Sequence, residues 1–221
     1  MGDLISLEQR RAARAGFHTR ARRAGISFYF DLVSPWTYLA AERVDRAFGD
    51  VRWRPAMADA LAGGRRVRLL PEDVVRPAAE ERAGQLGMPL IWPERWPALG
   101  DGAMRVAVLA AEHGRGAPFA LSTSRLAFCG GFDIDDPEVI AEAAAAAGLG
   151  LDAALRAAGE RHRDGALERA ALRLLRGGAD ALPALVVGRA LYAGEDRLAE
   201  AAAAATGDRA GAARRRPRLG A

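Results

Sequence analysis

A buried strand that runs directly into a helix is predicted for residues 26–44, ISFYFDLVSPWTYLAAERV. The first seven residues are mostly apolar and aromatic, which favours a strand. Ser34-Pro35 follows, and serine is a common N-cap while proline suits the first helical position, where no amide proton is needed. The apolar residues beyond it recur at helical spacing and share one face: Leu39, Ala40, Val44 and Phe48.

Three further segments have the texture of a sheet and its closing helix. Residues 50–56 predict a second strand that ends where Pro55 removes a ladder donor. A strand–helix–strand order implies a parallel pair with a crossover helix. Near the C-terminus, residues 182–188 and 189–194 predict a hairpin, and residues 195–205 predict a closing helix.

The middle of the chain is predicted to be all-helical. Gly and Pro divide it into segments at about 72–87, 102–114, 117–129, 136–147, 151–158 and 160–177. The resulting order is β–α–β, a helical insertion, and β–β–α, which is the order of a thioredoxin fold interrupted by helices. We therefore predict an α/β protein with a thioredoxin-like domain formed by residues 26–56 and 179–205, and a helical insertion domain at 57–178.

Composition limits the chemistry that the chain can perform. Cys129 is the single cysteine among 221 residues, so an internal disulfide, a CxxC couple and a cysteine-based metal cluster are excluded. Its apolar surroundings, RLAFCGG, favour a buried structural thiol. His18, His113 and His162 are far apart in sequence, so we expect neither a metal site nor a catalytic triad.

The charge and hydropathy of the sequence indicate which partners and which cellular compartment to expect. The formal net charge is +4, and arginines gather in segments 10–25 and 214–218, which we interpret as parts of basic tails at 1–25 and 206–221. No recognition motif accompanies them, so we expect no nucleic acid partner. The sequence has neither an apolar run of membrane-spanning length nor a secretory segment at its N-terminus. We expect a cytoplasmic protein with no membrane partner.

Several segments together resemble a known family. The chain is similar to the helical-insertion branch of the thioredoxin superfamily that contains DsbA-type proteins, and most of all to 2-hydroxychromene-2-carboxylate isomerases and kappa-class glutathione transferases. The resemblance covers about residues 26–204. The segments that carry it are FYFDLVSPWTYLA (28–40), WRP (53–55), LLPEDVVRPAAEERAGQLGMPLIWPERWP (69–97), FDIDDPEVIAEAAAAAGL (132–149), LPALVVG (182–188) and LYAGEDRL (191–198).

The resemblance implies a thiol site at the strand–helix junction. Ser34 would replace the first catalytic cysteine and hold the sulfur of glutathione, or of another low-molecular-weight thiol, as a thiolate. On the residues alone, an ordinary N-cap is the simpler explanation of Ser34, because Ser-Pro is common at a helix start. The other cofactor-binding residues that the resemblance implies are Pro35, Trp36, Leu182, a cis Pro183, Glu195 and Asp196. Thr37 occupies the second cysteine position, so dithiol exchange is not expected.

The residues predicted to contact the substrate are aromatic and basic. Trp36 lies between the two former cysteine positions, where it would touch a substrate ring. Trp92 and Trp96 fall in the loop that covers the substrate in the resembling enzymes, although a packed loop would explain them equally. Arg65 and Arg66 would face an acidic substrate, or they are solvated. Their segment, 60–70, is shorter than in the glutathione-using members and lacks an asparagine found there.

The function that the resemblance implies is a glutathione-dependent isomerase of the 2-hydroxychromene-2-carboxylate type, acting on a small aromatic acid from aromatic degradation. A kappa-type glutathione transferase is the alternative within the enzymes. A noncatalytic module that binds an extended peptide along Leu182-Pro183 is the alternative outside them. A homodimer is expected by analogy with the resembling enzymes.

Overall fold

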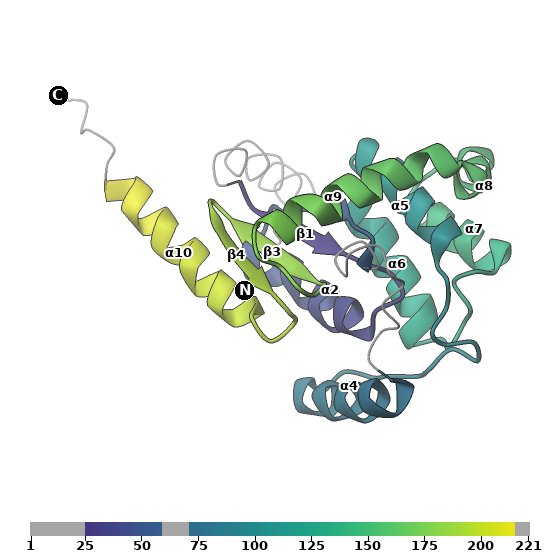
Figure 1. Ribbon diagram of the computed structural model, residues 1–221, viewed down its shortest axis with the longest axis horizontal. Coiled ribbons are helices and arrows are strands. Elements are labelled where there is room, and N and C mark those ends of the chain that lie inside the picture. Colours follow the sequence, from purple (N-terminus) through teal and green to yellow (C-terminus); the bar gives the residue numbers. More distant parts are fainter. Residues whose placement is uncertain (1–24, 59–70, 215–221) are drawn as a thin grey trace, which may run out of the picture.

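The computed structural model describes residues 25–58 and 71–214 (Figure 1). A four-stranded mixed sheet has the order β2-β1-β3-β4. Its strands are β1 (Ser27–Phe30), β2 (Arg52–Pro55), β3 (Ala184–Val187) and β4 (Ala190–Ala193). β1 pairs parallel to β2 and antiparallel to β3, and β3 pairs antiparallel to β4. This is a thioredoxin-like α/β fold with a helical insertion, so the predicted fold class is confirmed.

The two faces of the sheet are covered by different helices. Phe28 and Phe30 belong to the main core, which includes residues of α2 (Pro35–Phe48) and α10 (Leu198–Arg214). Tyr29 points to the opposite face, because side chains alternate along a strand. There it meets Ala171 and Leu174 of α9 (Asp164–Arg176). The sheet is therefore sandwiched between helices, as the buried run of β1 requires.

The insertion supplies the remaining helices. These are α4 (Glu72–Leu86), α5 (Asp101–Glu112), α6 (Gly116–Phe128), α7 (Pro137–Ala146), α8 (Leu151–Gly159), the 3-10 turn η1 (Arg161–Arg163) and α9. α5 and α6 pack beside β2, whereas α4 lies apart from this group, at the bottom of Figure 1. The α7 start agrees with its predicted cap, because the Asp136 carboxylate accepts a hydrogen bond of 2.8 Å from the Glu138 amide.

Several boundaries differ from prediction. The sequence predicts that the last helix opens at residue 195, but α10 begins at Leu198, after a turn in which the Leu198 amide donates to the Glu195 carbonyl at 3.2 Å. α10 also continues to Arg214, past the predicted end at 205, through a segment in which Ala210, Ala212 and Ala213 favour a helix whereas Gly207 and Gly211 do not. The predicted strand at 182–188 is shorter, since the segment begins with Leu182-Pro183 and Pro183 cannot donate to the ladder.

Candidate active site

Sheet register brings three separate segments to one end of the sheet. Tyr29 of β1 pairs with Ala184 of β3, and Ala184 pairs with Ala193 of β4. Residues that follow β1, precede β3 and follow β4 therefore share this end. They include Ser34, Leu182-Pro183 and Glu195-Asp196. The peptide bond between Leu182 and Pro183 is cis, as the resemblance implied, and the Pro183 carbonyl accepts from the Gly194 amide at 2.8 Å.

Ser34 begins α2 with an extended backbone, φ −93° and ψ 124°. Its carbonyl accepts from the amides of Thr37 and Tyr38 at 3.1 and 3.4 Å, which defines it as the N-cap residue. Its hydroxyl makes no capping hydrogen bond. Pro35 at the first helical position is buried, and Trp36 packs against the main core while half-buried. The predicted N-cap position is confirmed, but the Ser34 side chain does not cap the helix with a hydrogen bond.

The turn before Ser34 is braced from within. Asp31 is buried, and its carboxylate accepts from the Val33 amide at 3.1 Å and from the Ala58 amide at 3.0 Å. The Asp31 amide in turn donates to the Thr37 hydroxyl at 3.3 Å. Thr37, in the second cysteine position, is thus a structural partner of the turn. Sequence reasoning missed Asp31, although its place directly after a buried strand was a signal.

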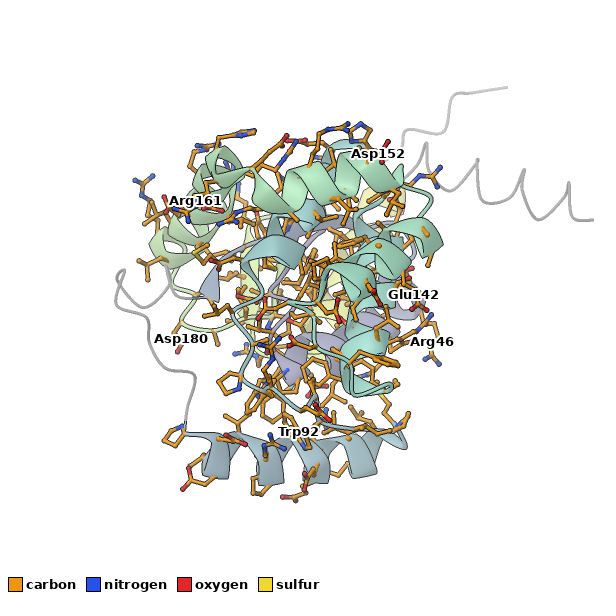
Figure 2. The ribbon with its side chains drawn as sticks, turned by 90° about the vertical axis from the view of Figure 1, so that its right-hand side faces the viewer. Arg46, Trp92, Glu142, Asp152, Arg161 and Asp180 are labelled. Atoms are coloured by element: carbon orange, nitrogen blue, oxygen red, sulfur yellow. The ribbon has the colours of Figure 1, made fainter. Side chains whose placement is uncertain are left out.

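An aromatic loop connects α4 to the turn. Trp96 is buried, and its Nε1 donates to the Val33 carbonyl at 3.0 Å, one residue before Ser34. The Trp92 ring lies 4.6 Å from that of Trp96, and Trp92 Nε1 donates to Glu80 of α4 at 2.7 Å. Figure 2 shows Trp92 between α4 and the rest of the molecule. Both predicted tryptophans therefore lie in one layer that extends from α4 to Val33.

Glu195 is engaged by two arginines. Its side chain is 3% exposed, and its carboxylate accepts from Arg82 Nε of α4 at 2.7 Å and also pairs with Arg43 of α2. The hydrogen bond to Glu195 raises the pKa of Arg82. Direct cofactor binding was predicted for Glu195, but its two oxygens are already hydrogen-bonded within the protein. We infer that Glu195 holds α2, α4 and the end of β4 together.

Tyr38 makes a second connection between α2 and the insertion. Its hydroxyl donates to the Pro89 carbonyl at 2.8 Å and lies 3.1 Å from the Cys129 sulfur. Burial and the hydrogen bond to Cys129 raise the pKa of Tyr38. Cys129, which was predicted to be a buried structural thiol, is only partly buried but does have this packing partner.

The remaining predicted site residues are charged. Arg65 and Arg66 lie outside the described residues, so their predicted contact with an acidic substrate stays a prediction. Asp196 is exposed, in the turn before α10. It is close enough to Arg82 to contribute to the raised pKa of that arginine.

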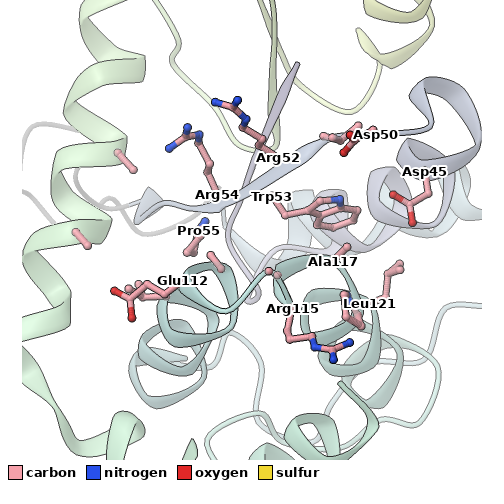
Figure 3. Close-up of a pocket in the computed structure, with 18 of the residues that line it drawn as sticks. Asp45, Asp50, Arg52, Trp53, Arg54, Pro55, Glu112, Arg115, Ala117 and Leu121 are labelled. Carbon is pink, nitrogen blue, oxygen red and sulfur yellow. The ribbon is translucent and has the colours of Figure 1, made fainter. Parts of the chain in front are cut away.

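A large cavity lies elsewhere, along β2 (Figure 3). It measures about 1230 Å³ and extends from the end of α2 at Asp45 past Trp53 to the α5–α6 corner at Arg115. Asp45 is in the last turn of α2, and 14 helical residues separate the two ends of that helix by about 20 Å. The cavity is therefore distant from Ser34. We place the candidate site at Ser34 because the helix N-terminus, the cis proline and the aromatic layer meet there.

Neither a metal cluster nor a membrane-spanning helix is found in the described part of the chain. Within residues 25–58 and 71–214, no group of three or more His, Cys, Asp and Glu side chains is arranged to hold a metal ion. None of the helices in these ranges combines the length and the apolar character needed to cross a bilayer.

Comparison with known proteins agrees with this architecture. A 2-hydroxychromene-2-carboxylate isomerase structure superposes with a TM-score of 0.70 at 17% identity, covering 83% of this chain and 94% of the isomerase. The cytosolic disulfide reductase DsbM from Pseudomonas aeruginosa, in a structure with GSH, gives a TM-score of 0.57 at 22% identity, covering 83% of this chain and 98% of DsbM. At these identities the likeness concerns the fold.

The search of curated proteins gives no match. Residues 25–205, by contrast, match the model of one protein family along most of the chain. The protein belongs to the family of DSBA-like thioredoxin domains.

Proposed function

We propose that the protein binds glutathione, or a thiol of similar size, at Ser34 and uses it to isomerise a small aromatic acid of the 2-hydroxychromene-2-carboxylate type. The observation that carries this proposal concerns Ser34. This residue caps a 14-residue helix, but its hydroxyl makes no capping hydrogen bond. Two structural neighbours support the choice of reaction and thiol, since one is a 2-hydroxychromene-2-carboxylate isomerase and the other is DsbM in a structure with GSH.

The residues at this end of the sheet fit a thiol ligand. A helix N-terminus carries partial positive charge and favours a bound anion. Pro35 has no amide proton, and the Trp36 amide has no backbone acceptor among the described residues, so Ser34 and Trp36 together offer donors to a sulfur anion. The backbone of Leu182, before the cis proline, would pair with the peptide part of the ligand, and Asp196 with its ammonium group.

When bound, glutathione would supply a thiolate that adds to the substrate, permits rotation about a bond of the opened ring, and leaves unchanged. The protein lowers the cost of forming that thiolate through the α2 N-terminus and the Ser34 hydroxyl. Dithiol exchange is not part of the proposal, because the sequence has one cysteine and it lies at the end of α6.

Isothermal titration with glutathione tests the thiol site. We expect binding at millimolar glutathione or below, and a roughly tenfold weaker affinity in Ser34→Ala, which is the cost of one hydrogen bond to a charged group. Ser122→Ala, a matched change on α6, should bind as the unaltered protein does. Absence of binding by the unaltered protein would contradict the proposal.

A second measurement separates the enzymes from one another. Conversion of 2-hydroxychromene-2-carboxylate, followed by its ultraviolet spectrum, should depend on glutathione without consuming it. A kappa-type transferase would instead consume glutathione with a chlorodinitrobenzene electrophile. Glutathione consumption without isomerisation would replace the isomerase proposal by the transferase.

A further inference from the structure

One arginine lies in the corner between the two loop tryptophans. The guanidinium carbon of Arg76, on α4, is 4.7 Å from the centroid of the Trp92 ring and 5.6 Å from that of Trp96. The two rings are inclined at 58° to each other. Arg76 therefore makes cation–π contacts with two indoles at once, which restrict the orientation of its guanidinium and cover part of its faces.

The same side chain keeps unused donors. Arg76 Nε lies 2.5 Å from Glu72, but this ion pair lacks hydrogen-bond geometry. Neither Nη group of Arg76 donates a hydrogen bond within the part of the chain that the structure describes, and the side chain is 29% exposed. A guanidinium has five N–H donors in a planar fork. The outer edge of Arg76 can thus pair with an anion from solution.

Arg76 differs from the arginines near it. Arg82 and Arg43 donate hydrogen bonds to Glu195, and the exposed Arg95 forms an ion pair with Asp133 but has no cation–π contact with either loop tryptophan in the described part of the chain. Arg76 is also connected to the Ser34 turn, because the Trp96 ring that it contacts donates its Nε1 proton to the Val33 carbonyl. A flat ligand resting on this aromatic layer would have the guanidinium at one end and Ser34 towards the other.

From these contacts we infer that Arg76, supported by Trp92 and Trp96, binds the carboxylate of a planar aromatic or conjugated acid. Carboxylates pair with guanidinium through two parallel hydrogen bonds, and these are stronger where water is excluded. Arg76 would therefore make a negative charge a requirement for the substrate. This inference rests on the proposed function and names the substrate class of the same site.

The test is isothermal titration with naphthoate and with its neutral amide, both without any thiol. The unaltered protein should bind the acid more tightly than the amide. Arg76→Gln should weaken acid binding about tenfold and leave amide binding unchanged, since only the charge-assisted pair is lost. The affinity of Arg76→Lys for the acid should lie between those of the unaltered protein and Arg76→Gln, because lysine keeps the charge but not the planar fork. Arg95→Gln, in the loop that carries the two tryptophans, should match the unaltered protein.

The ratio of acid to amide affinity distinguishes recognition of the carboxylate by Arg76 from a packing defect caused by the substitution. A packing defect in Arg76→Gln would weaken both ligands equally, and that result would overturn the inference, as would an unaltered protein that binds both ligands equally. The glutathione titration is independent of this ratio. Arg76-dependent acid binding without glutathione binding would keep the carboxylate site and contradict the thiol proposal, and the reverse result would do the opposite.

Discussion

Single glycines decide how closely the insertion approaches the Ser34 turn. Gly100 is the N-cap of α5 and has φ +69°, a conformation that L side chains rarely adopt. A Cβ at this position would lie 2.4 Å from Val33 Cγ1 and 3.3 Å from Ile134 Cδ1. Because Val33 immediately precedes Ser34, the absence of a side chain at Gly100 allows α5 to support the turn.

Gly100→Ala should therefore destabilise the protein. The left-handed backbone and the contact with Val33 act in the same direction, and together they should lower the free energy of unfolding by about 1–3 kcal/mol. Urea denaturation followed by circular dichroism measures the change. Displacement of Val33 should also weaken glutathione binding in the same variant.

Gly84→Ala is the matched control, with an effect of opposite sign. Gly84 is exposed inside α4, and a Cβ there would meet no atom within 4 Å. Alanine should stabilise the protein by about 0.5–1 kcal/mol, the difference in helix propensity. Equal destabilisation by the two changes would show that the contact with Val33 is unimportant.

Local signals in the sequence were sufficient for most elements, and distant partners were not. α2 and its start at Ser34 were predictable because capping and helical periodicity involve neighbouring residues. Glu195 was assigned to a helix start, where acids are common. Its actual partners, Arg82 and Arg43, are 113 and 152 residues away in sequence, and no local pattern indicates them. Arg76 was missed for the same reason, since stacking on the loop tryptophans depends on tertiary structure.

At the scale of the elements, these distant contacts attach α4 to the rest of the molecule. Few residues of α4 are buried: Val75, Ala79 and Ala83. Val75 and Ala83 reach the main core, and the other connections of α4 to the rest of the molecule are polar or aromatic, through Arg82, Glu80 and Arg76. With little apolar burial to hold it, α4 depends on these contacts more than the core helices do.

Glu195→Gln should loosen α4 more than the rest of the fold. The change removes the negative charge between two arginines and should lower the free energy of unfolding by about 2 kcal/mol. Hydrogen exchange should become faster in the amides of residues 72–86, with smaller changes in β1. Glu200→Gln, which breaks an exposed pair with Arg197, should leave exchange and stability unchanged. Uniform acceleration across the sheet would argue against a local role for Glu195.

At the level of the whole molecule, the residue type that carries the positive charge determines how that charge depends on pH. All 32 basic residues are arginine, because the sequence contains no lysine. Arginine stays protonated well above pH 10, so the protein keeps nearly all its positive charge in alkaline solution. Tyr38 is the tyrosine whose environment couples its titration to folding, because burial and the hydrogen bond to Cys129 raise its pKa.

Tyr38→Phe should change how stability depends on alkaline pH. Because the pKa of Tyr38 is raised in the folded protein, the fold retains this proton above about pH 10, where the unfolded chain has lost it. Its stabilising contribution is complete below that pH and is lost as pH rises, with a slope of about 1.4 kcal/mol per pH unit. Urea unfolding at a series of pH values should show that slope reduced by this amount in Tyr38→Phe. Tyr29 and Tyr192 remain in both proteins, so identical slopes would mean that the Tyr38 hydroxyl is not held between Pro89 and Cys129 in solution.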